Sequence, residues 1–225
     1  MHDVGSHHPR GLGSPRLYDL MLLGMTRGRE WKYRERLLDL AHVAAGHNVL
    51  DIGCGTGTLA IAAWRRSQPH GSVCGVDVST SMIAAARRKG RPFKPNASLR
   101  FLEAEAVALP FGDSIFDTVM ITTVMHMLLD PERSPALKEA SRVLRPGGRL
   151  LLVDYGGPQR VGWVARHHLH RTFDLNSLRP LLPGANLAEA DGGPLGWLSL
   201  QYLLATKPDA FGERIAAPSR DRERC

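Results

Sequence analysis

The stretch that most constrains the fold is residues 49–60, in which an apolar run ends in an acid and passes into a glycine-rich turn. Residues 49–52 have the length and composition of a buried strand, and residues 59–64 have those of an alanine-rich helix. Between them stand three glycines in five positions, Gly53, Gly55 and Gly57. Because glycine adopts positive φ and has no Cβ, this turn lets the backbone approach a ligand closely.

The spacing of these glycines argues against a pyrophosphate cofactor. The dinucleotide fingerprint G-x-G-x-x-G would need a glycine at position 58, which is Thr58. Asp51, two residues before the first glycine, would repel a phosphate but can accept hydrogen bonds from an ammonium group, directly or through water. The turn therefore predicts a ligand that is cationic near Asp51.

The segment V-L-D-I-G-C-G-T-G at residues 49–57 resembles motif I of the class I S-adenosylmethionine-dependent methyltransferases. In that family the loop holds the methionine part of the cofactor. The resemblance therefore implies a cofactor site that contains Asp51, Gly53, Cys54, Gly55 and Gly57. A cysteine at this place is expected to be a small residue packed in a turn rather than a nucleophile.

An acid also ends the second predicted strand. Residues 72–76 are an apolar strand that leads to Asp77, and Ser79 or Thr80 is the expected N-cap of the next helix. In a βαβ unit an acid at this place meets the two hydroxyls of a ribose, and one carboxylate can accept both hydrogen bonds. Asp77 is therefore the predicted ribose ligand. Val78 and Met82 follow it in the expected cofactor site, although a methionine on a helix is more often part of the core.

Residues 99–103 predict a third strand, followed by A-E-A-V-A-L-P-F at residues 104–111. This segment resembles G-D-A-x-x-L-P-F of the same family, whose acid accepts from the adenine amino group while the next backbone N–H meets a ring nitrogen. The resemblance implies these contacts for Glu105 and Ala106. The sequence departs from the pattern because Glu105 replaces Asp and Ala104 replaces Gly, so the longer side chain must still reach the amine.

Residues 115–122 predict a fourth strand, and ligands of open α/β sheets lie beyond the carboxyl ends of the strands. Thr122 and His126 fall at that end, whereas Asp117 falls at the other and is expected to be structural. Because imidazole exchanges protons near neutral pH, His126 is the candidate base for an acceptor that must lose a proton. A histidine that only packs the crossover is the alternative.

The N-terminal region predicts a tail and two helices. Residues 1–15 are rich in His, Gly, Ser and Pro without periodicity, which indicates a disordered tail. Residues 16–45 predict two cap helices, 16–24 and 29–45, with Gly46 ending the second. The first resembles the Y-D-L-M segment of ubiquinone/menaquinone-type methyltransferases, where a helix closes over the cofactor. This implies a cofactor contact for Tyr18, although packing of the helix is an equal alternative.

The remainder of the chain completes the predicted sheet. A helix over 132–144 stops at R-P-G-G, a fifth strand covers 149–154, and strands at 185–190 and 195–207 form a final hairpin-like pair. The family places substrate-recognition inserts before this pair, so residues 156–183 are expected to cover the acceptor. A metal is not expected, because the three histidines His167, His168 and His170 could not converge on one ion if they lie on one helix, and no acid or cysteine joins them. Residues 208–225 are expected to be a mobile tail.

Composition narrows the function further. The 225 residues suit one domain, of which 43% are hydrophobic and 23% charged, and neither a spanning segment nor a secretory signal is apparent, which indicates a cytoplasmic protein. Three cysteines, Cys54, Cys74 and Cys225, form no metal-ligand spacing and are expected to be reduced. The net charge is +7, with six cations and no acid between residues 86 and 100. No aromatic residues alternate with those cations, so a solvated surface is favoured over nucleic-acid binding.

The resemblance covers residues 16–207 and implies a Rossmann-like α/β fold. The expected sheet has seven strands, mostly parallel with one antiparallel strand, and helices on both faces. The implied function is methyl transfer from S-adenosylmethionine, giving S-adenosylhomocysteine, to a small hydrophobic acceptor of lipid or quinone type, as in the UbiE-like branch (methyltransferase type 11). A homodimer is compatible with this. The alternatives are a module that binds the cofactor without turnover and a nucleotide-dependent oxidoreductase, which Asp51 and Thr58 oppose.

Overall fold

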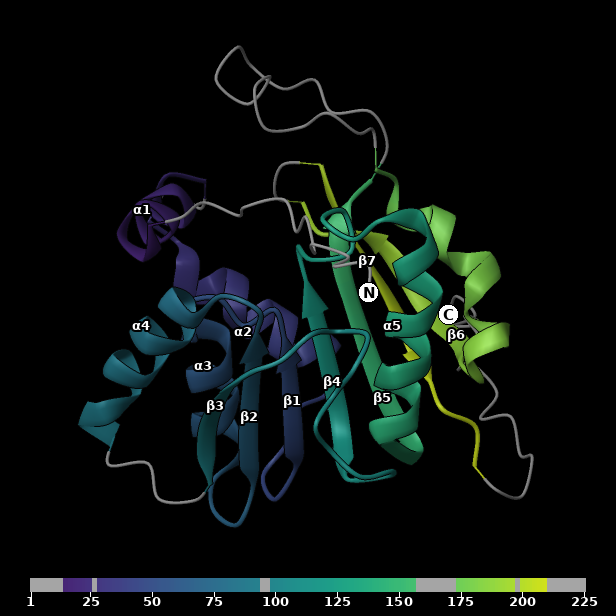
Figure 1. Cartoon of the computed structure of the whole chain (residues 1–225), viewed down its shortest axis with the longest axis horizontal. Coiled ribbons are helices and arrows are strands. Elements are labelled where there is room, and N and C mark those ends of the chain that lie inside the picture. The colour runs from purple at the N-terminus through teal and green to yellow at the C-terminus, as the bar shows by residue number, and fades with distance from the viewer. Residues whose placement is uncertain (1–13, 26–27, 94–97, 157–172, 197–198, 210–225) are drawn as a thin grey trace, which may run out of the picture.

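The computed structural model describes residues 14–25, 28–93, 98–156, 173–196 and 199–209, and its centre is a seven-stranded sheet (Figure 1). The strand order is β3-β2-β1-β4-β5-β7-β6. The strands are β1 (Asn48–Ile52), β2 (Ser72–Asp77), β3 (Leu99–Glu103), β4 (Phe116–Thr122), β5 (Leu144–Tyr155), β6 (Ala188–Pro194) and β7 (Leu200–Thr206). The strands β1 to β5 pair in parallel, and β7 runs antiparallel to both β5 and β6. The predicted sheet, with one antiparallel strand, is confirmed.

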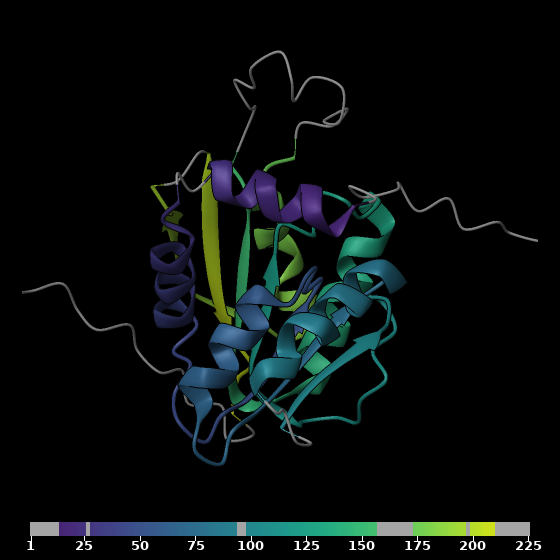
Figure 2. The same ribbon diagram turned by 90° about the vertical axis from the view of Figure 1, so that its left-hand side faces the viewer.

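Helices cover both faces of this sheet (Figures 1 and 2). The α-helices are α1 (Pro15–Met25), α2 (Glu30–Leu40), α3 (Thr58–Ser67), α4 (Thr80–Gly90) and α5 (Asp130–Val143), and the 3-10 helices are η1 (Arg91–Phe93), η3 (Leu175–Leu181) and η4 (Pro183–Ala185). None of the helices in the described ranges is long and apolar enough to cross a membrane.

The alternation of side chains along β1 shows how the two layers of the core arise. Leu50 and Ile52 pack into a cluster with α5 and the 3-10 helices, whereas Val49 packs into a cluster with α2 and α3. Successive side chains of a strand point to opposite faces, so an apolar run is what a strand buried on both faces requires. Asp51 shares the face of Val49, which places a carboxylate beneath the start of α3.

Three predicted boundaries were wrong. The helix expected over 29–45 ends at Leu40 because the chain turns at Ala41 and His42, and Gly46 instead donates its N–H to the Ser67 carbonyl at 2.8 Å. The fifth strand begins at Leu144, since the R-P-G-G segment continues as extended chain with a register shift against β4. The first of the final strands is shifted to Ala188–Pro194, because residue 185 still belongs to η4, and the second begins only at Leu200.

The carboxyl ends of the parallel strands define the edge on which the site lies. The loops after β1, β2, β4 and β5 all leave the sheet at this edge, and α1 lies across it (Figure 2). Residues 1–13 of the expected N-terminal tail, 157–172 of the expected insert and 210–225 of the expected C-terminal tail lie outside the described residues, and Pro15 already belongs to α1.

Candidate active site

The glycine loop between β1 and α3 has the backbone conformation that its sequence predicts. Gly53, Gly55 and Gly57 all have positive φ, at 71°, 52° and 78°. The N–H groups of Gly53 and Cys54 donate to the Val76 carbonyl at 2.8 and 2.9 Å, which fixes the loop to the end of β2. A Cβ at Gly57 would lie 2.8 Å from the Cβ of Ala86, so this position also permits the close approach of α4.

Asp77 holds this loop as well as standing at the predicted ribose position. Its Oδ2 accepts from the Gly55 N–H at 2.9 Å, and its Oδ1 accepts from the Ser79 N–H at 2.9 Å. Each carboxylate oxygen has more than one acceptor site, so both oxygens remain able to accept a hydroxyl. Ser79 is the N-cap of α4, as predicted, and its Oγ accepts from the Met82 N–H.

Asp51 is a buried carboxylate without a partner. Its exposure is 1%, and neither of its oxygens has a partner that meets full hydrogen-bond geometry. Burial, followed by the charge of Asp77, raises the pKa of Asp51 to about 8, and the backbone amide of Ala60 acts in the opposite direction. An isolated buried carboxylate is costly unless it is neutral or meets a cation. The ammonium group of the amino acid part of S-adenosylmethionine is a cation of the required kind, so the residues present fit this cofactor.

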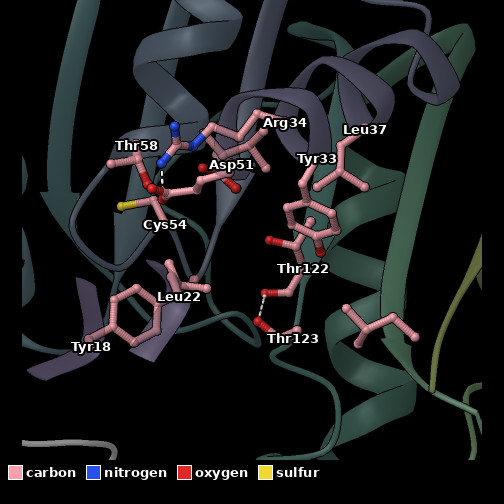
Figure 3. Close-up of a pocket in the computed structure, with 14 residues that line it drawn as sticks. Tyr18, Leu22, Tyr33, Arg34, Leu37, Asp51, Cys54, Thr58, Thr122 and Thr123 are labelled. Atoms are coloured by element: carbon pink, nitrogen blue, oxygen red, sulfur yellow. Dashed lines mark hydrogen bonds and ion pairs between the residues drawn. The ribbon is translucent and has the colours of Figure 1, made fainter. Parts of the chain in front are cut away.

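A pocket opens beside Asp51 at the carboxyl edge of the sheet (Figure 3). Tyr18 and Leu22 of α1 stand on the opposite side of it from Tyr33 of α2. The other lining residues come from α2, the glycine loop, α3, the end of β4 and β7, and are Glu30, Arg34, Leu37, Asp51, Gly53, Cys54, Thr58, Leu59, Thr122, Thr123 and Leu200. The structure therefore brings together four predicted side chains: Tyr18, Asp51, Cys54 and Thr122.

Helix α1 is attached to the glycine loop by a polar cluster. The Asp19 carboxylate accepts from Thr56 Oγ1 at 2.6 Å and pairs with Lys89 Nζ at 3.0 Å, and Lys89 also donates to Thr56 at 2.8 Å. These contacts place Tyr18 over Gly55, where a Cβ would lie 3.2 Å from the Tyr18 ring. Burial, and then the charges of Asp51 and Asp77, raise the pKa of Tyr18, so its hydroxyl stays protonated.

The predicted adenine side lies beyond Asp77, at the ends of β2 and β3. Val78 and Glu105 are exposed there, whereas Met82 and Ala106 are buried. Glu105 forms an isolated antiparallel bridge with Ala108. These four residues, Val78, Met82, Glu105 and Ala106, are not among those that line the pocket beside Asp51. Their contacts with adenine stay predictions.

His126 follows β4 and is held by the end of β5. Its backbone N–H donates to Asp154 Oδ2 at 3.1 Å, and its Nδ1 lies 2.9 Å from Asp154 Oδ1. Asp154 is fully buried, while one fifth of the His126 side chain is exposed. The ring of Tyr155 meets the His126 ring edge to face at 5.1 Å. An oriented imidazole with one exposed edge can take up a proton.

Sequence reasoning missed several residues of this site. Tyr33, Arg34 and Leu37 of α2 line the pocket, but only the burial of Leu37 followed from the apolar pattern of the helix. Leu200 reaches the pocket from the last strand. Asp154 was placed on the active-site face by its position at the carboxyl end of the fifth strand, but its pairing with His126 was not predicted.

Cys54 and Cys74 are free and buried, and burial raises the pKa of both, that of Cys74 to about 11, so both are protonated thiols. Within the described ranges no group of three or more His, Cys, Asp or Glu could hold a metal ion. His167, His168 and His170 lie outside those ranges, as does Cys225.

Solved structures of similar fold support the architecture. A SAM dependent methyltransferase from Aquifex aeolicus has a TM-score of 0.70 at 19% identity, covering 86% of this chain and 98% of that one. The [4+2]-cyclase SpnF has a TM-score of 0.68 at 20% identity, covering 80% of this chain and 81% of that one. At such identities the likeness shows the fold alone, and the two proteins are named for different activities.

Sequence relatives identify the family. A model described as a methyltransferase domain matches residues 49–148. A demethylmenaquinone methyltransferase of Thermus thermophilus is 39% identical, over 89% of this chain and 86% of the relative. The ubiquinone/menaquinone biosynthesis C-methyltransferase UbiE of Edwardsiella ictaluri is 32% identical, over 89% of this chain and 76% of the relative. These matches confirm the resemblance of motif I and with it S-adenosylmethionine as the cofactor. The chain belongs to the class I S-adenosylmethionine-dependent methyltransferases and is similar to their ubiquinone/menaquinone biosynthesis branch.

Proposed function

We propose that this methyltransferase methylates a ring carbon of a quinone-like acceptor in its reduced, hydroquinone form. The observation that carries the proposal is the 39% identity to a demethylmenaquinone methyltransferase, which extends over 89% of the chain. The pocket adds support, because apolar and aromatic side chains such as Leu22, Tyr33 and Leu200 line it. Such a lining suits a flat, hydrophobic ring.

In this proposal the chain holds the cofactor at three strand ends. The buried carboxylate of Asp51 receives the ammonium group, and Asp77 receives the two ribose hydroxyls while Gly53, Gly55 and Gly57 shape the loop between them. Val78 and Met82 flank the adenine, and Glu105 with the Ala106 N–H contacts its polar edge. Tyr18 closes the site from α1, beside Cys54 and Thr122. When bound, S-adenosylmethionine supplies a methyl group that its sulfonium has already activated.

His126 is the proposed catalytic base. A hydroquinone hydroxyl that gives its proton to His126 Nε2 becomes a phenolate, and the negative charge spreads onto the neighbouring ring carbon that accepts the methyl group. The neutral dienone that results loses the proton of that carbon to water, and the protonated His126 returns its proton to the oxygen, so that the aromatic hydroquinone is restored. Positioning of the ring within reach of the methyl group supplies the remainder of the acceleration, about 7 to 11 kcal/mol at best.

The proposal includes a cytoplasmic location, where the free Cys54 and Cys74 thiols stay reduced. A homodimer stays a prediction. The second candidate function is a protein that binds S-adenosylmethionine without turnover, and it is supported by the lining of the pocket, which includes Asp51 and Cys54 but not the proposed base His126.

The first experiment is a calorimetric titration of the full chain with S-adenosylmethionine, S-adenosylhomocysteine and NADH. Micromolar binding of the first two, about −8 kcal/mol, and none of NADH is the expected result. A methyl transfer assay with demethylated short-chain hydroquinones then tests the acceptor, with the oxidised quinones as the matched control. Turnover of hydroquinone alone supports the proposal, whereas cofactor binding without turnover of any hydroquinone supports the second candidate.

A further inference from the structure

The large apolar side chains that the described residues expose gather at one end of the molecule. Three of them, Leu17, Leu20 and Leu23, lie on α1, and Trp31 stands at the start of α2. Val78 follows β2, and Met127 and Leu129 follow β4, so these three leave the sheet at its carboxyl edge. The remaining one, Ile115, precedes β4 at the opposite edge. Most of the exposed apolar surface therefore lies on the side of the molecule where the pocket opens.

Helix α1 separates this surface from the pocket. Leu17, Leu20 and Leu23 are 50%, 63% and 49% exposed, and their spacing of three residues keeps them on one side of the helix. Tyr18 and Leu22 line the pocket on the other side. A helix that is apolar toward solvent as well as toward the protein needs an apolar environment on its outer side.

The charges around α1 favour an anionic environment. The exposed cations are Arg16 at the start of α1, Arg29 just before α2 and Lys32 in the first turn of α2. The acids of the same segment are already matched, since Asp19 pairs with Lys89 at 3.0 Å and Glu30 pairs with Arg34. A helix with an apolar face and flanking cations is the arrangement that lies in the interface of an anionic bilayer.

We propose that this surface, Leu17, Leu20, Leu23 and Trp31 with the cations Arg16, Arg29 and Lys32, rests on an anionic lipid bilayer. The apolar side chains enter the boundary between headgroups and acyl chains, and the cations meet the lipid phosphates. The biological role given to this surface rests on the proposed function. A hydroquinone with a long apolar tail dissolves in lipid, and a site whose mouth faces the bilayer receives the ring without moving the tail through water.

The test measures partition of the full chain onto sedimented vesicles of phosphatidylcholine alone and of phosphatidylcholine with phosphatidylglycerol. The wild type is expected to bind the anionic vesicles and to lose about tenfold in partition between 50 and 200 mM salt, because the cations contribute. The triple variant Leu17→Gln/Leu20→Gln/Leu23→Gln is expected to bind at least about tenfold more weakly. Glutamine is a good helix former, so the substitution changes polarity rather than helix content.

The matched control compares single variants. Leu20→Gln is expected to weaken vesicle binding, whereas Ile115→Gln, which changes a comparably exposed apolar residue at the opposite edge, is expected to leave it unchanged. Equal binding of both vesicle types would overturn the role of the cations. Vesicle binding that is absent in the wild type, or unchanged in the triple variant, would overturn the proposal. So would a concentration-dependent dimer that the triple variant abolishes, because a second copy would then cover the surface.

Two readouts separate this inference from the proposed function. Calorimetric binding of S-adenosylmethionine and methylation of a short-chain hydroquinone in buffer are expected to be unchanged in the triple variant, while methylation of a long-chain hydroquinone in vesicles falls. Vesicle binding without any methyl transfer would leave the surface established and remove the proposed acceptor. Methyl transfer without vesicle binding would support the proposed acceptor and overturn the membrane surface.

Discussion

His126 and Asp154 are joined through both the backbone and the side chain of the histidine, with Nδ1 at 2.9 Å from Oδ1 and the backbone N–H at 3.1 Å from Oδ2. The Tyr155 N–H also donates to Oδ1, at 2.9 Å. A carboxylate can only accept, so the neutral imidazole carries its proton on Nδ1 and leaves the lone pair on Nε2. The geometry thus fixes the tautomer that a base needs, and Asp154 acts as a positioning residue.

Asp154→Asn is expected to lower kcat for a hydroquinone by about 10²-fold or more, because the amide group favours the wrong tautomer of His126. Binding of S-adenosylmethionine is expected to change little. Nitrogen NMR of the imidazole would show the proton on Nδ1 in the wild type and on Nε2 in the variant.

A double-mutant cycle separates positioning from a purely structural effect of Asp154. In a His126→Gln background, Asp154→Asn is expected to cost almost nothing further in kcat, because its effect passes through the imidazole. An equal loss in both backgrounds would show that Asp154 acts on the fold instead.

Cofactor affinity is expected to rise with pH because of Asp51. Its pKa is raised to about 8, so most molecules are protonated at pH 7 and must release that proton before the carboxylate can meet an ammonium group. Between pH 6 and 7.5 the association constant should rise up to about tenfold per pH unit. Calorimetry in buffers of different ionisation enthalpy would detect the released proton. Asp51→Asn should bind weakly and without this slope.

The same raised pKa predicts the opposite effect on the stability of the free protein. Between the ordinary pKa of 3.8 and about 8 the folded chain binds more protons at Asp51 than the unfolded chain, so the free energy of unfolding falls as the pH rises. Asp51→Asn should remove this slope of at most about 1.4 kcal/mol per pH unit. Urea unfolding at pH 5 and pH 8 would measure it. Asp117→Asn is the control. Asp117 accepts from the Asn48 N–H at 2.8 Å and pairs with Arg145, so this substitution should lower the free energy of unfolding of the protein.

Asp77→Ala is expected to weaken cofactor binding by at least about 10²-fold, because two charge-assisted hydrogen bonds contribute about 1.5 to 3 kcal/mol each. The structure adds a cost to the fold, since the Gly55 and Ser79 N–H groups lose their acceptor. Asp77→Asn keeps one acceptor oxygen and is the milder comparison. An unchanged affinity in Asp77→Ala would contradict the ribose assignment.

Gly57→Ala is expected to lower the free energy of unfolding by about 2 to 4 kcal/mol, through positive φ and through overlap with Ala86 and Phe101. Gly46→Ala isolates the first cause, because Gly46 has a φ of 82° but no atom within 4 Å of the added Cβ. Its cost should be about 1 to 2 kcal/mol. Equal losses in the two variants would show that the close packing of α4 contributes nothing.

The strands that carry the cofactor site could be predicted from the sequence because their signals are local. The apolar runs before Asp51 and Asp77 gave the correct strands, and the glycines between Asp51 and Thr58 gave the correct turn. The end of α2 could not be predicted, since Ala44 and Ala45 suit a helix and only the path to β1 makes the chain turn earlier. Propensity is a weak prior wherever a tertiary connection decides the boundary.

The pocket beside Asp51 was harder to predict because its residues meet only in three dimensions. Tyr33 of α2, Thr122 of β4 and Leu200 of β7 line one pocket although most of the chain separates them. The pairing of His126 with Asp154 likewise joins the ends of two neighbouring strands. Sequence spacing placed each end at the correct edge but did not show which side chains face one another there.

The position of β7 has a consequence for how the protein matures during synthesis. Among the strands that the structure describes, β7 is the last in sequence, yet it lies between β5 and β6 and is the one described strand with which β6 pairs. On the ribosome, β1 to β5 with the cofactor loops can assemble first. β6 cannot pair with β7 until residues 200–206 have been synthesised. Because Leu200 lines the pocket beside Asp51, one wall of that pocket is completed by the same late insertion. A nascent chain would therefore have its glycine loop and the acids Asp51 and Asp77 in place before the pocket is closed on this side.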